Sequence, residues 1–475
     1  MKSARAEGRR LNHARGLRQG DPLSPYLFIL AIDTLQNILE LNGLLSPLRG
    51  RHAKLWLSLY ADDAVIFINP VKEEVQALFG ILEQFGSATG LKLNLEKCSV
   101  APIRCAGTNL DQILESFVGK RVSFPITYLG LPLTLGRLKM VHVQGTVDKS
   151  RTKLAGWQGR LLNPAGRREL VSSVLSSIPT YLMASMKVPR QLKEDIDKIR
   201  RRFLWAGDKE LTGGKCKVAW TTVAKPIDFG GLGIIDLERF SRALRIRWLW
   251  FQWANPERPG NGTEMPVDKS IEAANFNPEE TEEDSIVWTL ESSGEYTAKS
   301  AYAVQFAGNI VSNHPALIWR VWATPKCKYF IWLLLQNRLW TAARLQLRRW
   351  TNNYFCALCE RNLETAHHLF FECPFSLEVW HGIAVWSGCS SLEPSSWTEE
   401  DDLEDQYSQA FTAGDKKGQS LLILTLWNIW NCRNEVIFRG VRKTVQVTIT
   451  MIKDTAQHWS WAGCKALRVD HVVSE

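Results

Sequence analysis

Residues 55–68 read Leu-Trp-Leu-Ser-Leu-Tyr-Ala-Asp-Asp-Ala-Val-Ile-Phe-Ile, and this stretch decides the fold that the sequence predicts. Apolar, β-rich segments flank Tyr60-Ala61-Asp62-Asp63, which predicts a β-hairpin with both acids at its tight connection. Adjacent carboxylates repel each other, so two of them between apolar strands are favourable when a cation such as Mg²⁺ binds there. An ordinary Asp-Asp turn is the alternative, and the tetrapeptide alone does not exclude it.

A glycine-bracketed turn precedes this hairpin. Gly16 to Pro25 reads Gly-Leu-Arg-Gln-Gly-Asp-Pro-Leu-Ser-Pro, with Asp21 placed to cap a helix and Pro22 to occupy its first turn. Apolar side chains then recur at helical spacing and predict a buried face made of Leu23, Leu27, Leu30, Thr34 and Ile38.

Two further motifs follow the hairpin. They are Gly90-Leu91-Lys92-Leu93-Asn94 with Lys97, and Tyr128-Leu129-Gly130-Leu131-Pro132-Leu133. In this order and spacing the set resembles the palm of reverse transcriptases of non-LTR (LINE-type) retrotransposons, especially those of plant genomes. The resemblance implies an RNA-directed DNA polymerase that copies an RNA template from a DNA primer at a site with two Mg²⁺ ions.

The resemblance also implies roles for single residues. Asp62 would bind Mg²⁺ with Asp63 as a lesser partner, and Tyr60 would pack near the primer end. Lys97 would donate a proton to the leaving pyrophosphate, although by itself it is a surface lysine. Contacts to template, nucleotide and primer would come from Arg18, Gln19, Gly20, Tyr128, Leu129 and Gly130.

One part of the site is missing from the sequence. In this family a first aspartate stands on a strand before the Arg-Gln-Gly-Asp-Pro turn, and residues 1–15 contain none. Asp33 is the nearest substitute, but its place in an amphipathic helix explains it better. The fingers segment is absent as well. We therefore expect little or no polymerase activity from this chain by itself, because misplacement by an ångström costs on the order of a hundredfold in rate.

The composition is globular, with 45% hydrophobic and 23% charged residues and a net charge of +9. Residues 1–20 hold six Lys or Arg against one acid, and residues 137–204 hold fifteen against five. Such basic stretches suit a phosphate backbone, and a solvated helix face is the alternative for a single cluster such as Lys198 with Arg200, Arg201 and Arg202.

The second motif with chemistry is Cys356-x2-Cys359-x8-His368-x4-Cys373. Three thiolates and one imidazole make a closed tetrahedral shell, which is typical of structural zinc. His367 is a rival for the imidazole position. No secretion signal precedes the ten cysteines, which favours reduced thiols over disulfides.

The region around this motif has its own resemblance. Residues 293–302, 319–350 and 364–374 resemble the zinc-binding region that follows the polymerase in plant non-LTR elements. Five tryptophans there would stack on bases or, more commonly, belong to the core: Trp319, Trp322, Trp332, Trp340 and Trp350.

We predict an α+β chain with a partial right-hand polymerase palm (a β-hairpin plus helices), a helical thumb and a mostly helical, Trp-rich zinc-binding domain. The predicted divisions are a palm at 1–136, a thumb and connection at 137–254, an acidic Pro/Gly linker at 255–284, the zinc-binding domain at 285–388, an acidic linker at 389–418 and a C-terminal helical segment at 419–475.

Three interpretations remain open: an inactive polymerase copy, a non-catalytic nucleic-acid-binding protein that uses the thumb and zinc knuckle, and an incomplete gene model of an active enzyme. No apolar run reaches the roughly eighteen residues that a membrane span needs, and no signal peptide is visible. We therefore expect an intracellular protein, neither secreted nor inserted in a membrane. Target-primed copying at chromosomal DNA points to the nucleus, although no clear basic import cluster is present.

Overall fold

The computed structural model describes residues 20–41, 43, 45, 46, 48, 57–61, 63–154, 156–207, 209–211, 214–254, 287–398 and 402–468. The predicted linker at 255–284 lies outside these residues, as do Arg18, Gln19 and Asp62. The described chain is mostly helical with three two-stranded sheets, which confirms the α+β class. It divides into two compact units, Met1–His142 with Phe251–Ser285, and Val143–Trp250 with Ile286–Glu475.

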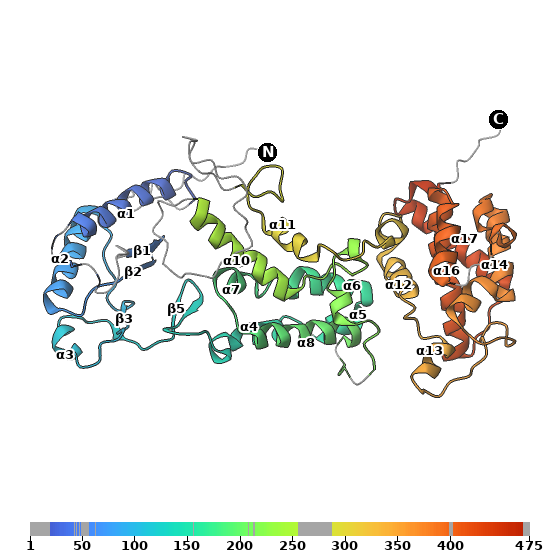
Figure 1. The fold of residues 1–475 in the computed structure, drawn as a ribbon, viewed down its shortest axis with the longest axis horizontal. Helices are drawn as coiled ribbons and strands as arrows, with labels where there is room; N and C mark the ends of the chain where they lie inside the picture. The colour runs from blue at the N-terminus through green and yellow to red at the C-terminus, as the bar shows by residue number, and fades with distance from the viewer. Residues whose placement is uncertain are drawn as a thin grey trace, which may run out of the picture. The chain divides into compact units, whose positions relative to one another are not determined.

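The first unit is built on two long helices, one short helix and three small sheets (Figure 1). Its elements are α1 (Ser24–Leu41), β1 (Leu57–Tyr60), β2 (Asp63–Ile66), α2 (Lys72–Thr89), β3 (Ser99–Val100), α3 (Leu110–Ile113), β4 (Lys120–Arg121), β5 (Ile126–Tyr128) and β6 (Leu131–Leu133). The pairs β1–β2 and β5–β6 are antiparallel, and β3–β4 is parallel. Leu35 and Leu39 of α1 pack on Leu78, Ile81 and Phe85 of α2, which leaves the β1–β2 hairpin at the edge of a small core.

The helix after the Gly-Asp-Pro turn forms as predicted, and the Asp21 carboxylate accepts a hydrogen bond from the Leu23 N–H (2.9 Å). Its predicted buried face was wrong. Leu23 and Leu30 are 65% and 66% exposed, whereas Leu35 and Leu39 are buried against α2. Apolar residues surround the first turns of this helix, so spacing alone does not select the face that packs. Asp33 is exposed on α1, which agrees with its interpretation as a polar-face residue.

The second unit is helical. It contains α4 (Met140–Thr152, shared with the first unit at its start), α5 (Gly156–Leu161), α6 (Pro164–Leu170), η1 (Val171–Leu175), α7 (Thr180–Ser185), α8 (Arg190–Ala206), α9 (Trp220–Val223), η2 (Ile227–Phe229), α10 (Leu237–Ala254), α11 (Ala298–Ala303), η3 (Val304–Phe306), η4 (Pro315–Trp319), α12 (Pro325–Leu335), α13 (Ala342–Leu347), η5 (His368–Glu372), α14 (Pro374–Ser387), η6 (Ser390–Leu392), η7 (Pro394–Ser396), α15 (Leu403–Thr412), α16 (Lys416–Arg439), α17 (Val445–Trp461) and η8 (Lys465–Leu467).

One continuous core runs through this second unit. It joins Leu175 and Phe203 of the 143–250 segment to Trp332 of α12 and to the buried faces of α14, α16 and α17. The Trp332 indole N–H donates to the Gly230 carbonyl (2.9 Å), and the Arg168 guanidinium donates to the Leu232 carbonyl. Hydrogen bonds therefore add to the apolar packing that joins the 143–250 segment to α12 and the later helices.

The segment 389–418 is not a linker where the structure describes it. Helix α15 is capped by Asp402, whose carboxylate accepts from the Glu404 N–H (2.6 Å), and Tyr407 and Phe411 are buried in the shared core. The acids occupy the first turn, where the helix dipole favours negative charge. Acidic composition concealed an amphipathic helix, so the linker prediction was wrong.

The basic cluster at the end of α8 contains both a buried structural residue and a surface residue. Arg200 is fully buried and bonds Asp197, the Ser176 hydroxyl and the Ile235 carbonyl, so it serves the fold. Lys198 pairs with Asp195 on the surface (2.9 Å). None of the described helices is both long enough and apolar enough to cross a bilayer.

Candidate functional site

The β1–β2 hairpin presents its acids at an exposed tip. Tyr60 pairs with Asp63 as the last rung of the ladder, which leaves positions 61 and 62 as a two-residue connection. Ala61 has φ of 50°, a left-handed conformation that costs a non-glycine residue free energy. Asp63 and Tyr60 are both exposed, and no described Lys or Arg forms an ion pair with Asp63. The tip therefore offers an uncommitted carboxylate.

The hairpin β5–β6 lies beside strand β1. The Tyr128 hydroxyl is 3.3 Å from the Ser58 hydroxyl of β1, so two motifs that are seventy residues apart in the chain meet in space. Tyr128 and Leu131 close β5–β6 around Leu129 and Gly130, whose φ values are both positive (50° and 75°). Positive φ at both central residues is the geometry of the tight hairpin turn that fits the strand twist.

The other predicted polymerase residues are placed less closely. Gly20 is exposed with φ of 84° at the start of α1. Lys97 is exposed on a turn, where its own N–H donates to the Asn94 carbonyl (3.1 Å). The described structure pairs Tyr60 with Asp63 and joins Tyr128 to Ser58, two positions before Tyr60. Among the described residues, Lys97 makes no hydrogen bond or ion pair with any of these side chains.

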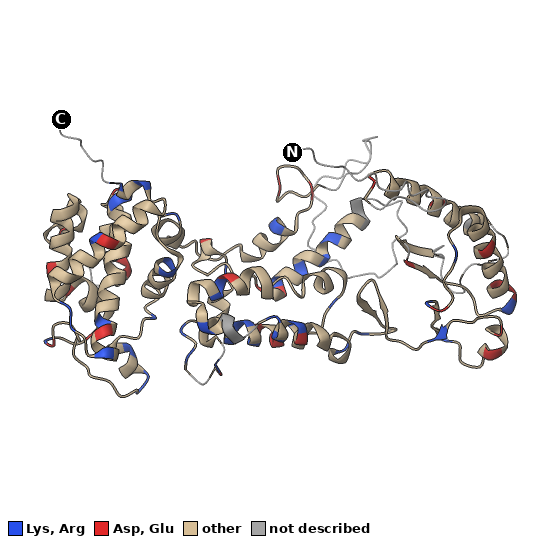
Figure 2. Ribbon diagram, turned by 180° about the vertical axis from the view of Figure 1, so that it is seen from behind, with Lys and Arg blue, Asp and Glu red and all other residues tan. Residues whose placement is uncertain are grey.

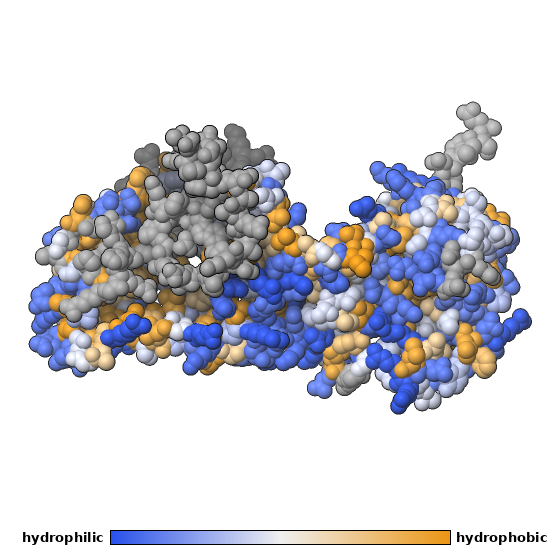
Figure 3. All heavy atoms as spheres, viewed as in Figure 1, coloured by the Kyte–Doolittle hydropathy of each residue, from blue (hydrophilic) through white to orange (hydrophobic). Residues whose placement is uncertain are grey.

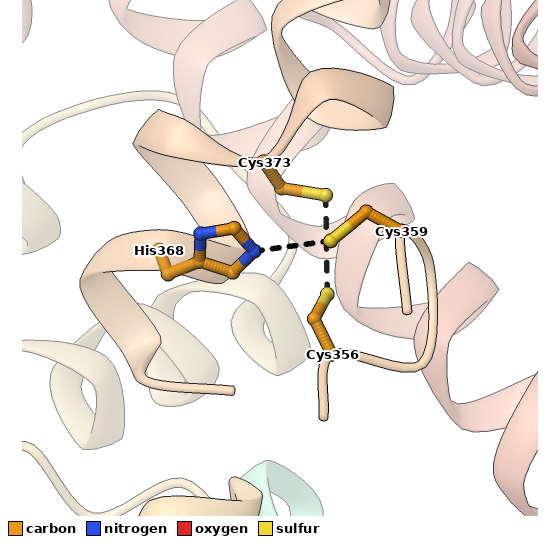
Figure 4. Close-up of side chains that lie close together, drawn as sticks. All are labelled: Cys356, Cys359, His368 and Cys373. Carbon is orange, nitrogen blue, oxygen red and sulfur yellow. Dashed lines mark hydrogen bonds between the residues drawn. The ribbon is translucent and has the colours of Figure 1, made fainter. Parts of the chain in front are cut away.

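The four zinc-type side chains come together in the second unit. Cys356 and Cys359 stand on a knuckle that a bridge between Phe355 and Leu363 closes, and the Cys356 N–H donates to the Asn362 carbonyl (2.8 Å). His368 begins the π-turn η5 and Cys373 ends it, with the Cys373 N–H bonded to the His368 carbonyl (2.7 Å). The wide turn places both side chains toward the knuckle (Figure 4).

The distances in this cluster fit a tetrahedral ion. All four ligand atoms lie within 4.8 Å of one another. The Cys356 and Cys373 sulfurs are 3.8 Å apart, and the Cys359 sulfur is 3.3 Å from Nε2 of His368 (Figure 4). Two sulfurs bound about 2.3 Å from a tetrahedral centre lie about 3.8 Å apart, so the donors fit Zn²⁺.

The cluster is mostly closed to solvent, with Cys359 as its half-buried member. Cys356 and Cys373 are fully buried and His368 is 3% exposed. A hydrogen bond from Cys356 lowers the pKa of the Cys373 thiol, and hydrogen bonding to Cys356 raises the pKa of His368 to about 9. The lowered pKa of Cys373 favours its thiolate, which is the form that binds metal.

His367, the rival ligand, lies outside the cluster. Its Nδ1 is 3.0 Å from the Glu372 carboxylate, and the same carboxylate is 3.6 Å from Nδ1 of His368. Nδ1 of His368 is buried and has no hydrogen-bond partner in the described chain. Glu372 is therefore the residue best placed to orient the imidazole.

Sequence reasoning missed a buried ion pair next to the cluster. Glu364, 1% exposed, accepts two hydrogen bonds from Nε of Arg433 (3.1 Å each) and one from the Ala342 N–H (2.9 Å). Arg433 belongs to α16 and lies over the Trp430 ring. No local pattern in the sequence connects residues 69 positions apart, so the pair was not predictable.

The comparisons with known proteins agree with both motifs. Residues 2–133 match the family described as reverse transcriptase (RNA-dependent DNA polymerase), and residues 296–380 match the family described as zinc-binding in reverse transcriptase. The first match contains both hairpins, and the second contains all four cluster residues. The chain therefore carries a reverse-transcriptase domain and a reverse-transcriptase zinc-binding domain, which supports the predicted relation to the reverse transcriptases of non-LTR retrotransposons.

Several curated proteins are similar. A putative ribonuclease H protein of Arabidopsis thaliana is 20% identical over 53% of this chain and 57% of its own length. A retrovirus-related Pol polyprotein from the type-2 retrotransposable element R2DM of Drosophila melanogaster is 29% identical over 50% of this chain and 22% of its own length. An uncharacterized protein of transposon TX1 from Xenopus laevis is 26% identical over 52% and 18%. The chain thus spans less than two thirds of each relative.

Proposed function

We propose that this chain contributes the palm hairpin, primer-side hairpin and thumb of an RNA-directed DNA polymerase. The observation that carries the proposal is the exposed tip of β1–β2, where the Asp63 carboxylate forms no ion pair among the described residues and the neighbouring strand residue Ser58 contacts Tyr128 of the second hairpin. Asp62 and Asp63 would hold Mg²⁺, which stabilises charge on a transferred phosphate. Tyr60 would pack at the primer end, and Tyr128, Leu129 and Gly130 would hold the primer strand.

The remaining roles follow from the matched motifs. Arg18, Gln19 and Gly20 would contact the template and the incoming nucleotide. Lys97, exposed and therefore free to reach a bound nucleotide, would protonate the leaving pyrophosphate. Residues 137–254 would form the thumb and connection, with the thumb gripping duplex.

Zinc has a different role in this proposal. Cys356, Cys359, His368 and Cys373 would hold it in a closed shell, where it supplies folding free energy and leaves no position for water. The cluster is buried among α12, α14 and α16, so we assign it to the stability of the second unit.

A polypeptide of these 475 residues alone should polymerise poorly. Before the hairpin, the aspartates are Asp21, which caps α1, and Asp33, which is exposed on α1. Neither stands on a strand facing the hairpin tip. Because one carboxylate ligand of the two-metal site is missing, we expect weak Mg²⁺ binding and primer extension near background.

Metal-directed cleavage tests the hairpin proposal without needing turnover. Fe²⁺ with ascorbate replaces Mg²⁺ and cuts the backbone near the site that binds it. We expect cuts next to residues 60–63 that excess Mg²⁺ suppresses and that Asp62→Asn with Asp63→Asn removes. Cuts that persist in this double variant, or none near the hairpin, would contradict the proposal.

A further inference from the structure

The segment between α12 and the zinc knuckle is rich in cationic and aromatic side chains, most of them exposed. It consists of Arg338, Trp340, Arg344, Arg348, Arg349, Trp350, Tyr354 and Phe355, which we call the arginine–aromatic surface. Figure 2 shows Lys and Arg colouring along α13 and its flanks, and Figure 3 shows hydrophilic and hydrophobic residues side by side there.

The arginines of this surface are not neutralised by the described chain. None of Arg338, Arg344, Arg348 and Arg349 forms an ion pair among the described residues. The two nearest acids along the chain are already committed, because Glu364 pairs with Arg433 and Glu360 with Arg442. Burial and the positive charges of Arg338 and Arg348 lower the pKa of Arg344. Like charges are thus held together, which is unfavourable unless an anion binds.

The aromatic rings are arranged for stacking. The guanidinium groups of Arg344 and Arg348 lie 5.9 and 6.0 Å from the centre of the Trp340 ring, and the Trp350 ring lies 5.1 Å from it at 32°. Trp350, Tyr354 and Phe355 are 42%, 50% and 51% exposed. Trp350 lies beside Arg348, and Tyr354 and Phe355 follow it closely in the chain, so half-exposed rings are available to a planar ligand.

Two contacts make the surface rigid. Glu364 caps α13 through the Ala342 N–H and is anchored by Arg433. Trp350 also packs near Gly214, where a Cβ would come within 3.3 Å of its ring, so the surface continues toward exposed Lys215. A fixed array loses less entropy on binding than mobile side chains do.

We infer that the arginine–aromatic surface binds single-stranded nucleic acid, with arginines at the phosphates and Trp350, Tyr354 and Phe355 stacked on unpaired bases. Exposed ring faces need unstacked bases, which duplex does not offer. The inference rests on the proposed function only in taking nucleic acid as the ligand, since the surface belongs to the second unit and contains no part of the hairpin.

Fluorescence anisotropy of the full zinc-loaded chain with a labelled oligo(dT) strand tests it, with no primer or nucleotide present. We expect Arg348→Gln with Arg349→Gln to weaken binding about tenfold and to reduce the salt slope by about 1.4. Trp350→Ala should weaken binding about five- to tenfold, and Trp350→Phe should retain most of it.

The matched control is Lys416→Gln with Lys465→Gln, which removes the same charge from exposed sites. Lys416 lies on α16 about 25 Å along the helix from Arg433.

If the control pair weakens oligo(dT) binding as much as the arginine pair does, net charge alone accounts for the loss of affinity and the inference is overturned. Duplex binding as tight as single-strand binding, with the same losses, would overturn the single-strand assignment. The two proposals can fail separately. The arginine and tryptophan variants should leave Fe²⁺ cleavage at the hairpin unchanged, and the Asp62→Asn with Asp63→Asn variant should leave oligo(dT) binding unchanged.

Discussion

The two metal-type sites of this chain differ in how much structure surrounds them. The β1–β2 tip stands on four-residue strands at the edge of a small core, with Asp63 open to solvent. The cysteine–histidine cluster is buried in a core that includes α12, α14, α16 and α17. An open site can admit substrate and exchange its metal, whereas a closed one holds its ion and stabilises the fold. The difference explains why one motif predicts chemistry and the other predicts stability.

The largest expected effect is at the closed site. Cys373→Ser should abolish zinc binding and greatly destabilise the second unit, because structural zinc sites bind with about 10–16 kcal/mol in peptides. Zinc content and the thermal transition measure this. Cys389→Ser, which removes a half-buried thiol outside the cluster, should keep one zinc per chain. Loss of zinc in the control variant would count against the assigned ligands.

Next comes the ion pair beside the knuckle. Glu364→Ala should cost about 3–5 kcal/mol, because it leaves the buried Arg433 charge without a partner. Glu360→Ala breaks the exposed pair with Arg442 and should cost less than about 1 kcal/mol. Urea unfolding of both variants gives the two values. Similar costs would show that the buried pair does not anchor α16 to the knuckle.

The next largest loss of stability is expected from a substitution at Gly231, a glycine of the second unit. A Cβ on Gly231 would lie 2.0 Å from the Lys225 carbonyl oxygen, so Gly231→Ala should destabilise by about 2–3 kcal/mol. Gly145→Ala, at an open position inside α4, should be neutral or stabilise by up to about 1 kcal/mol. Chemical denaturation compares them, and a neutral Gly231→Ala would disprove the close approach.

The smallest effect is expected at the open site. Ala61 has φ of 50°, so Ala61→Gly should relieve strain and stabilise the hairpin by up to about 1 kcal/mol. Amide hydrogen exchange at the paired residues Ser58 and Val65, whose amides point into the ladder, should slow by up to about fivefold. Faster exchange in the glycine variant would mean that the turn conformation is not strained.

Short sequence patterns predicted the features that depend on residues close together in the chain. The β1–β2 hairpin followed from two apolar runs around the acids, and the meeting of Cys356, Cys359, His368 and Cys373 followed from ligand spacing. Helix α15 was hidden by its acidic first turn, and the packed face of α1 depended on α2, which spacing within α1 does not encode. The pair Glu364–Arg433 and the contact of Tyr128 with Ser58 depend on tertiary folding.

Hydrogen exchange with and without a zinc chelator tests the contrast between the two sites most directly. The shared core predicts that chelation removes protection from the knuckle, from α12, α14 and α16, and also from α6 and α8 of the 143–250 segment. Protection of the β1–β2 hairpin should stay unchanged. Loss confined to residues 356–373, or loss that extends to the hairpin, would contradict the account of a closed site that stabilises one unit and an open site that stands apart from it.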